Sequence, residues 1–158
     1  MNSFYEKTEG EYQISTDPSK LNLEVIHKYL SQESYWANGI PFEKVKKSIE
    51  HSLCFGLYHL HELSMTAGRQ VGFARLITDK TTFAYLADVF VLENERGKGL
   101  SKFLMATIQS HPELLNLRGW LLRTKDAHGL YEQFGWSKLS EEQIQRFMVR
   151  FNPDVYKN

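Results

Sequence analysis

The stretch that most constrains this chain is residues 87–105, where a strand-like apolar run passes through a polar loop with two glycines into an amphipathic helical pattern. Glycines leave no Cβ in the way, so the backbone N–H groups of such a loop can close on an anion. The helix that follows leaves its first N–H groups unbonded and places the positive end of its dipole at the same point. Arg96, Lys98 and Lys102 add positive charge around it. The stretch therefore predicts a phosphate-binding socket; an ordinary strand-to-helix turn with a solvated basic rim is the alternative.

Composition makes any anion site a local one. The 158 residues carry 19 basic and 19 acidic side chains, so no overall field attracts nucleic acid or an anionic membrane. The length suits one domain, residues 1–158. The single cysteine, Cys54, allows no intrachain disulfide, and its apolar surroundings favour a buried core residue over a nucleophile. No signal-peptide core or membrane-length apolar run is present, so we expect a soluble, cytoplasmic protein.

Apolar periodicity predicts the element order β-α-α-β-β-β-α-β-α-β. The predicted strands cover residues 11–15, 52–61, 69–78, 82–91, 119–124 and 146–151, with a further strand start at 136–139. The predicted helices begin at Asp17-Pro18 and after Pro41, and cover residues 99–110 and 127–134, the last capped by Asp126. Residues 62–68 are predicted to be a polar hairpin connection, and the strand at 119–124 to be buried on both faces. The pattern predicts an α/β (α+β) protein, a mixed sheet with helices packed on it.

Two motifs resemble signatures of the GCN5-related N-acetyltransferase (GNAT) superfamily. The first is Gln or Arg, two residues, Gly, one residue, then Gly or Ala; residues 96–101 match it at Arg96 and Gly99 and depart at Ser101, which is still small. The second is similar to Asn-x-x-Ala-x-x-Leu-Tyr-x-x-x-Gly-Phe, with Thr124 in place of Asn and Trp136 in place of Phe. The two motifs occur in the family's order, and the resemblance covers nearly the whole chain.

The resemblance implies a GNAT-type, mostly antiparallel central sheet with splayed middle strands and helices on both faces. Acetyl-CoA, the acetyl donor, would lie in the notch between the splayed strands. Its pantetheine arm would pair with the backbone near Phe90 and Val91, and its pyrophosphate would rest on the glycine loop. The cofactor-binding residues implied in this way are Phe90, Val91, Arg96, Gly97, Lys98, Gly99, Leu100, Ser101, Lys102, Thr124 and Tyr131.

Direct acetyl transfer from a thioester to an amine needs a neutral amine, a hydrogen bond to the carbonyl oxygen and a proton for the leaving thiolate. Tyr131 matches the position of the family's acid, although it could simply pack on the sheet with its hydroxyl satisfied. The N–H group near Val91 is the expected oxyanion donor. Asp88, which alternation places on the face of Phe90, could hold an ammonium substrate and help to remove its proton. Alternatively, it bonds a loop backbone or pairs with an arginine such as Arg75.

Three further residues are candidates for binding the acceptor. Tyr35 and Trp36 lie in a segment that lines the acceptor side in this fold, where they would suit an apolar or cationic amine; ordinary packing is the alternative. His128 precedes Tyr131 by one helical turn and suits proton transfer near neutral pH, or it is simply an exposed helix histidine. His59 shares a strand face with a second histidine but lacks a third ligand, so no metal site is expected.

The sequence therefore predicts an acetyl-CoA-dependent N-acetyltransferase that acts on the primary amine of a small molecule. A non-catalytic acyl-CoA-binding sensor and a peptide or protein-lysine acetyltransferase are the alternatives. Tyr131 and Asp88 favour an enzyme over a sensor, and the balanced charge argues against basic protein tails as acceptors. Nucleic acid and membrane are not expected partners. Because dimers are common in the superfamily, a homodimer is one expectation.

Overall fold

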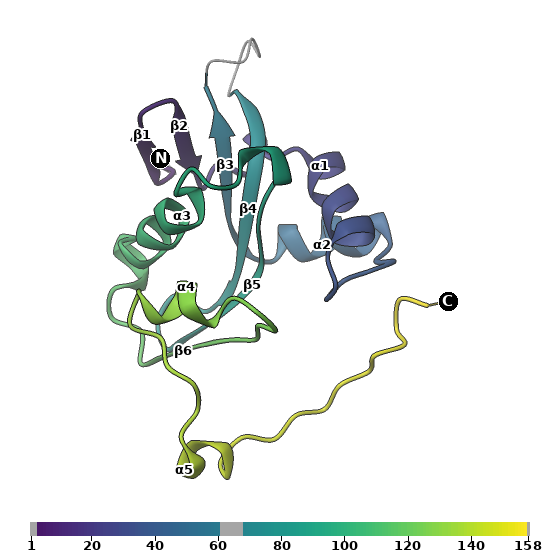
Figure 1. The fold of residues 1–158 in the computed structure, drawn as a ribbon, viewed down its shortest axis with the longest axis vertical. Helices are drawn as coiled ribbons and strands as arrows, with labels where there is room; N and C mark the ends of the chain where they lie inside the picture. Colours follow the sequence, from purple (N-terminus) through teal and green to yellow (C-terminus); the bar gives the residue numbers. More distant parts are fainter. Residues whose placement is uncertain (1–2, 61–67, 158) are drawn as a thin grey trace.

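The computed structural model describes residues 3–60 and 68–157, whose strands form one six-stranded sheet in the order β1-β2-β3-β4-β5-β6 (Figure 1). The strands are β1 (Glu6–Glu9), β2 (Tyr12–Ser15), β3 (Leu53–His59), β4 (Arg69–Thr78), β5 (Phe83–Val91) and β6 (Gly119–Leu122). The helices are α1 (Leu23–Lys28), α2 (Phe42–Glu50), α3 (Leu100–Gln109), α4 (His128–Glu132) and α5 (Glu141–Ile144). Shorter turns are η1 (Pro18–Lys20), η2 (Tyr29–Glu33), η3 (Glu93–Glu95) and η4 (Pro112–Leu114). No helix in this part of the chain is long and apolar enough to cross a membrane.

The sheet is antiparallel from β1 to β5, and β6 joins it in parallel. The parallel pairing covers only Phe83–Leu86 of β5, so among the described residues no strand lies beside the edge of residues 87–91 that faces β6. Helices α1 and α2 lie on one face of the sheet, and α3 and α4 lie on the other (Figure 1). The expected mixed sheet with splayed middle strands is therefore confirmed.

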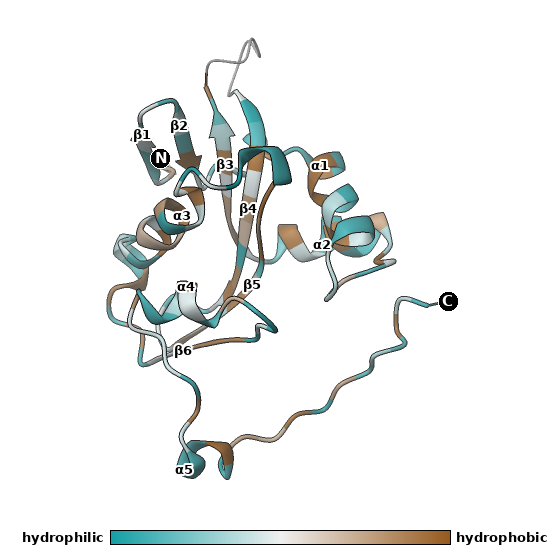
Figure 2. Cartoon of the chain, viewed as in Figure 1, coloured by the Kyte–Doolittle hydropathy of each residue, from teal (hydrophilic) through white to brown (hydrophobic). Residues whose placement is uncertain are grey.

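Two apolar clusters hold the helices to the sheet (Figure 2). Leu104 and Ile108 of α3 pack with one face of β3, β4 and β5, and Val45 and Ile49 of α2 belong to the cluster on the other face. Cys54 is buried in this second cluster, as predicted, and burial raises the pKa of its thiol to about 12. The thiol is therefore a core group, not a nucleophile.

A bulge in β5 sets the direction of Asp88. Arg75 of β4 is opposite Ala87, and Phe73 is opposite Phe90, so two residues of β5 face one residue of β4. Asp88 has a left-handed backbone, with φ of 53°. In a regular strand Leu86, Asp88 and Phe90 would all lie on one face. The bulge places Leu86 and Phe90 on opposite faces, and Asp88, which pairs with Arg75, lies on the face of Phe90. Asp88 and Phe90 thus share a face because of the bulge, not because of simple alternation.

The first 30 residues differ from the predicted pattern. Residues 6–9 form an exposed edge strand, which the sequence analysis missed because these residues are all polar. Asp17 caps only the short turn η1 through a bond from the Ser19 N–H. The α1 helix begins later, after a second cap. There the Asn22 side chain accepts from the backbone N–H groups of Glu24 and Val25.

The predictions after residue 118 need three corrections. The predicted strand at 146–151 and the strand start at 136–139 are wrong, because α5 and an extended segment follow α4. Strand β6 is half-buried, not buried on both faces, since its second edge has no partner in the described residues. Helix α4 is shorter than predicted, and Thr124 Oγ1, not Asp126, accepts from the Ala127 N–H. The predicted hairpin connection lies, except for Gly68, outside the described residues.

Candidate active site

A cavity of about 700 Å³ opens where β5 and β6 separate; we call it the notch. It is lined by β5, by the loop between β6 and α4, and by the loop that follows η2. Nine of the predicted site residues line it: Tyr35, Trp36, Asp88, Phe90, Val91, Arg96, Ser101, Thr124 and Tyr131. His128 does not line the notch; it lines a second hollow along β6, to which Thr124 and Tyr131 also contribute.

The glycine loop borders the notch and presents unbonded N–H groups. Gly97 and Gly99 have φ of 80° and 76°, and a Cβ at either position would meet no atom within 4 Å. In the described part of the chain, the backbone N–H groups of residues 97–102 donate to no protein acceptor. Successive backbone amides in a turn with left-handed glycines, at the N-terminus of a helix, form an anion-binding concavity. This loop therefore has the geometry that the sequence predicted for a phosphate socket.

Two of the three predicted cations already have protein partners. Arg96 donates to the Val91 carbonyl oxygen at 3.2 Å and to the Tyr29 hydroxyl at 3.1 Å. Lys98 Nζ donates to Glu95 Oε2 at 2.7 Å. Lys102 is exposed on the first turn of α3. In the described part of the chain, the unbonded backbone amides are therefore better placed than the side chains of Arg96 and Lys98 to receive an anion.

Glu95 is a buried carboxylate that anchors this loop, and sequence reasoning missed it. Its side chain is 4% exposed and accepts from Tyr12 Oη at 2.6 Å, Lys98 Nζ at 2.7 Å and Arg69 Nη2 at 2.8 Å. Burial would raise the pKa of the carboxyl, but the hydrogen bonds from Lys98 and Tyr12 and the charges of Lys98 and Arg69 outweigh burial and hold the pKa at about 2. No local pattern distinguishes Glu95 from its exposed neighbour Glu93, because the three partners come from β2, β4 and the loop.

Replacing Glu95 by Gln is expected to lower the free energy of unfolding at pH 7 by about 2–3 kcal/mol. The folded-state pKa lies below the ordinary value of 4.5, so the stabilisation is present above about pH 4.5 and is lost as the pH falls toward 2. Urea unfolding at pH 7 and at pH 3 measures the difference. Glu93→Gln is the control, and an equal effect of the two substitutions, or a Glu95→Gln effect that is no smaller at pH 3, contradicts the anchor role.

Asp88 is fixed by two side chains. Its Oδ2 accepts from Arg75 Nε at 2.7 Å, and its Oδ1 accepts from Trp36 Nε1 at 2.9 Å. Arg75 also donates to Ser52 Oγ at 3.1 Å. The carboxylate thus makes the arginine pairing that sequence analysis kept as an alternative, and it also ties the loop of Trp36 to the strand at the notch.

Aromatic rings connect the acceptor side to β5. The rings of Tyr35 and Trp36 meet edge to face at 5.1 Å, and Tyr29 stacks on Phe90 at 4.0 Å between centroids. Tyr35 Oη accepts from the Lys125 N–H at 2.8 Å, and Lys125 Nζ lies 5.7 Å from the centre of the same ring. These contacts bring together the loop after η2, β5 and the loop after β6.

Tyr131 lies in the wall of the notch and is 8% exposed. Its ring packs in the apolar cluster that holds α3 to the sheet, and its hydroxyl has no hydrogen-bond partner among residues 3–60 and 68–157. Burial, with smaller effects from Tyr35 and Asp126, raises the pKa of the hydroxyl to about 12. The phenol therefore keeps its proton throughout the neutral range. Within the described residues, no group of three or more His, Cys, Asp and Glu side chains could hold a metal ion.

Comparisons with known proteins agree with this geometry. A family model described as an acetyltransferase (GNAT) domain matches residues 54–138, which is 85 of the 158 residues and includes β5, the glycine loop and α4. A protein of Gibberella zeae that is named as an acetyltransferase is 33% identical over 127 residues, covering 72% of this chain and 68% of that protein. The chain belongs to the GNAT acetyltransferase family. The resemblance stated from the sequence is thereby confirmed.

Solved structures of the GNAT family extend the comparison. A GNAT-family protein of Xanthomonas campestris pv. campestris is 44% identical, with a TM-score of 0.85 over 96% of this chain and 100% of that chain. A Clostridium acetobutylicum protein described as an acetyltransferase with acetyl-CoA shares the fold at 11% identity, with a TM-score of 0.63 over 89% of this chain and 94% of that chain. This GNAT protein is therefore an N-acetyltransferase enzyme, as the sequence predicted for the type of enzyme.

Proposed function

We propose that this GNAT protein transfers the acetyl group of acetyl-CoA to the primary amine of a small molecule. One observation supports the proposal most directly: three groups that have no partner among residues 3–60 and 68–157 meet at the notch. They are the amides of the glycine loop, the strand edge of residues 87–91 and the phenol of Tyr131. GNAT enzymes use acetyl-CoA, which agrees with these features. A sensor would need the amides and the strand edge, but it would have no need of the phenol.

The residues of the notch suit acetyl-CoA. The free amides of residues 97–102 would hold the pyrophosphate, and the open edge of residues 87–91 could pair with the amides of the pantetheine arm. Bound acetyl-CoA would supply an acetyl group activated as a thioester. Arg96 donates to the Val91 carbonyl oxygen and so lies between the glycine loop and the open edge of β5. The N–H group near Val91 remains our expected oxyanion donor.

Tyr131 is the residue that we propose as the proton donor. Its hydroxyl holds its proton at neutral pH, faces the notch and has no competing protein acceptor in the described chain. A phenol in this state can deliver a proton to the sulfur that departs when the acetyl group moves to the amine. The amine must lose a proton as well, and water in the open notch can accept it.

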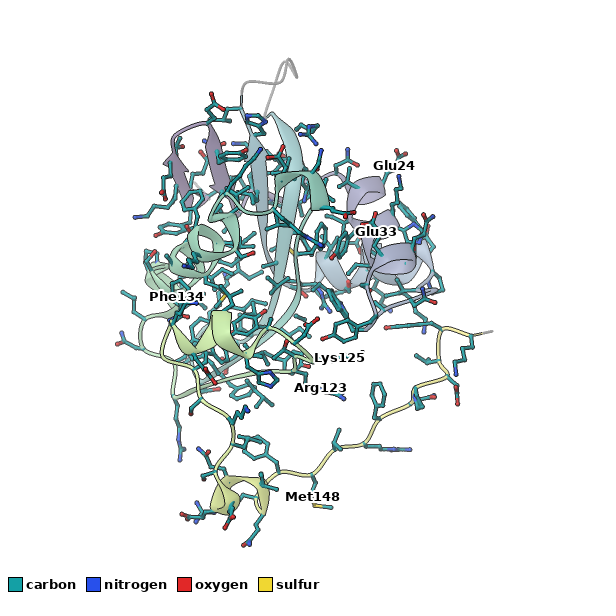
Figure 3. All side chains as sticks on the ribbon, in the orientation of Figure 1. Glu24, Glu33, Arg123, Lys125, Phe134 and Met148 are labelled. Carbon is teal, nitrogen blue, oxygen red and sulfur yellow. The ribbon has the colours of Figure 1, made fainter. Side chains whose placement is uncertain are left out.

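The acceptor half of the notch carries two cations that could bind an acidic group on the acceptor. Arg123 and Lys125 line it and make no ion pair in the described residues (Figure 3). Glu33 and Asp126 line it as well, also without an ion pair in this part of the chain, whereas Asp88 is paired. The Nζ of Lys125 also lies near the ring of Tyr35, where the sequence analysis expected an apolar or cationic acceptor. We propose that Arg123 and Lys125 bind a carboxylate or another acidic group of the amine, so that such an amine is preferred to a polyamine.

An assay of thiol release from acetyl-CoA tests the proposed function. The panel contains small primary amines with and without a carboxylate, polyamines and a lysine peptide, and product mass confirms the acetylated atom. We expect acidic small amines to give at least tenfold higher kcat/KM than polyamines. Tight CoA binding with no thiol released above background by any amine would favour the sensor. A preference for the peptide would favour the protein-lysine alternative.

Asp88→Asn is expected to raise the KM for the amine about tenfold, with a smaller change in kcat. We propose that Asp88 holds Trp36 and attracts the ammonium group, because both of its oxygens already accept hydrogen bonds and so serve poorly as a proton acceptor. Asparagine tolerates the left-handed backbone at this position, so the fold should persist. Steady-state kinetics between pH 6 and 9 measure both constants.

The control for this prediction is Glu33→Gln, which removes a second carboxylate that lines the notch but makes no ion pair in the described chain. We expect less than a threefold change in KM. If Asp88→Asn instead abolishes the dependence of kcat on pH, Asp88 is a general base. If it changes neither the kinetics nor the pH profile, the residue is purely structural.

A further inference from the structure

Residues 146–157, which we call the C-terminal segment, leave α5 and run toward α2 (Figure 1). In the described part of the chain, the backbone groups of residues 148–151 make no hydrogen bond. Side-chain contacts therefore hold the segment, and they occur at Phe151 and at Tyr156. The first contact is with the residue that follows β6, and the second is with α2, so the segment reaches both sides of the notch.

Tyr156 anchors the far end of the segment. Its ring packs against the apolar cluster that holds α2 to the sheet, and Lys44 Nζ lies 5.4 Å from the ring centre. Gly39, in the loop that follows η2, has φ of 77°, and a Cβ added there would lie 3.2 Å from the Tyr156 carbonyl oxygen. The two backbones thus approach closely, and the segment is attached to the same loop that forms the acceptor side of the notch.

Phe151 makes the contact at the other side. It lines the notch, and its ring centre lies 4.9 Å from the guanidinium carbon of Arg123. At this separation the negative face of an aromatic ring attracts a guanidinium. In the part of the chain that the structure describes, the Arg123 side chain makes no ion pair or hydrogen bond, which leaves the ring to restrain it.

The charge of Arg123 acts on the wall of the notch. Tyr85 of β5 lines the notch; burial raises the pKa of its hydroxyl, and the charge of Arg123 opposes that rise. The guanidinium therefore lies near enough to β5 to attract an anionic group inside the notch. Figure 3 shows Arg123 and Lys125 on the side of β6 that faces the C-terminal segment.

We propose that Phe151 is a positioning residue for the acceptor: its ring holds Arg123 where the guanidinium can bind the acidic group of the amine, and Tyr156 holds Phe151 in place. The inference rests on the proposed function, in which Arg123 binds that group. A long side chain must be ordered when it binds a ligand, and order imposed beforehand lowers that cost. The ring contact uses none of the N–H donors of the guanidinium, which stay available for a carboxylate.

The test measures how strongly each variant responds to an acidic group on the amine. Glycine, β-alanine and phenylalanine are each compared with their carboxamides in the thiol-release assay, and the ratio of kcat/KM for acid and amide is compared with the wild-type ratio. Arg123→Gln should lower the ratio at least about tenfold, mainly through the KM of the acid. Phe151→Ala should lower it about 2- to 5-fold by the same route, and Phe151→Tyr should restore it.

Two further variants test the link between these residues. Tyr156→Ala should lower the ratio as much as Phe151→Ala does. Combining Phe151→Ala with Arg123→Gln should lower it no further than Arg123→Gln alone, because the ring acts through the guanidinium. Thermal unfolding shows that each variant is folded.

Phe147→Ala is the matched control. Phe147 lies in the same segment and is 48% exposed, against 63% for Phe151, but it does not line the notch. Its ratio should equal that of the wild type. If Arg123→Gln lowers the ratio but Phe151→Ala does not, or if the two Phe→Ala variants behave alike, the positioning role is wrong and the proposed function stands. An unchanged ratio in Tyr156→Ala overturns the anchor. If no acid is acetylated, or Arg123→Gln leaves the ratio unchanged, the proposed acidic acceptor is wrong and the role of Phe151 falls with it.

Discussion

Replacing Tyr131 by Phe should lower kcat at least a hundredfold and leave the dissociation constant of acetyl-CoA within threefold of the wild-type value. General-acid catalysis by a positioned side chain is typically worth a factor of about 10²–10⁴. The hydroxyl has no hydrogen-bond partner in the described chain, so its removal should not destabilise the fold. A fall in kcat can therefore be assigned to the missing proton donor and not to a loss of folded protein. Steady-state kinetics, titration calorimetry with CoA and thermal unfolding measure the three quantities.

The control for this prediction is Tyr85→Phe, which removes a second phenol that lines the notch from β5. We expect kcat to change by less than threefold. Since burial raises the pKa of Tyr131 to about 12, the wild-type enzyme should show no loss of activity from this group below about pH 10. Equal losses in the two variants, or an unchanged kcat in Tyr131→Phe, would rule out Tyr131 as the acid.

Gly99→Ala should weaken acetyl-CoA binding by about 5- to 30-fold. Gly99 has φ of 76° and precedes α3 directly, so a Cβ there costs about 1–2 kcal/mol in the left-handed conformation. The loop can avoid that strain only by rotating away, and the rotation turns its free amides from the notch. The space around the position is open, so a packing clash adds nothing to the effect. Titration calorimetry with CoA gives the change in affinity directly.

Gly129→Ala is the matched control for the loop. Gly129 lies in α4, has an ordinary backbone conformation and is also open to added atoms, so the same methyl group should leave binding unchanged. Alanine should even favour the helix slightly. If Gly99→Ala binds CoA as tightly as the wild type, the left-handed loop does not hold the pyrophosphate.

Sequence analysis predicted the glycine loop and the elements on either side of it because their signals are local, whereas the notch itself was implied by the family resemblance. The glycines at 97 and 99, the apolar run of β5 and the period of α3 each depend on neighbouring residues, so the chain itself carries them. The family resemblance then connected Tyr131 to the same place. The analysis failed where a side chain depends on a distant partner: Glu95 looks like any loop acid until β2 and β4 bring Tyr12 and Arg69 to it.

Asp88 and residues 146–151 show the same limit. Alternation indicated the face of Asp88, but a bulge and a left-handed backbone put it there, and the partners Arg75 and Trp36 are 13 and 52 residues away. The pattern at 146–151 is typical of a strand, yet these residues pair with no strand in the described part of the chain. Periodicity is a property of adjacent residues, whereas strand pairing and burial of charge are set by contacts between segments remote in sequence. The sequence alone therefore determined the family, the anion loop and the candidate acid, and only the tertiary structure decided what holds Asp88 and Glu95 and where the last strand-like segment lies.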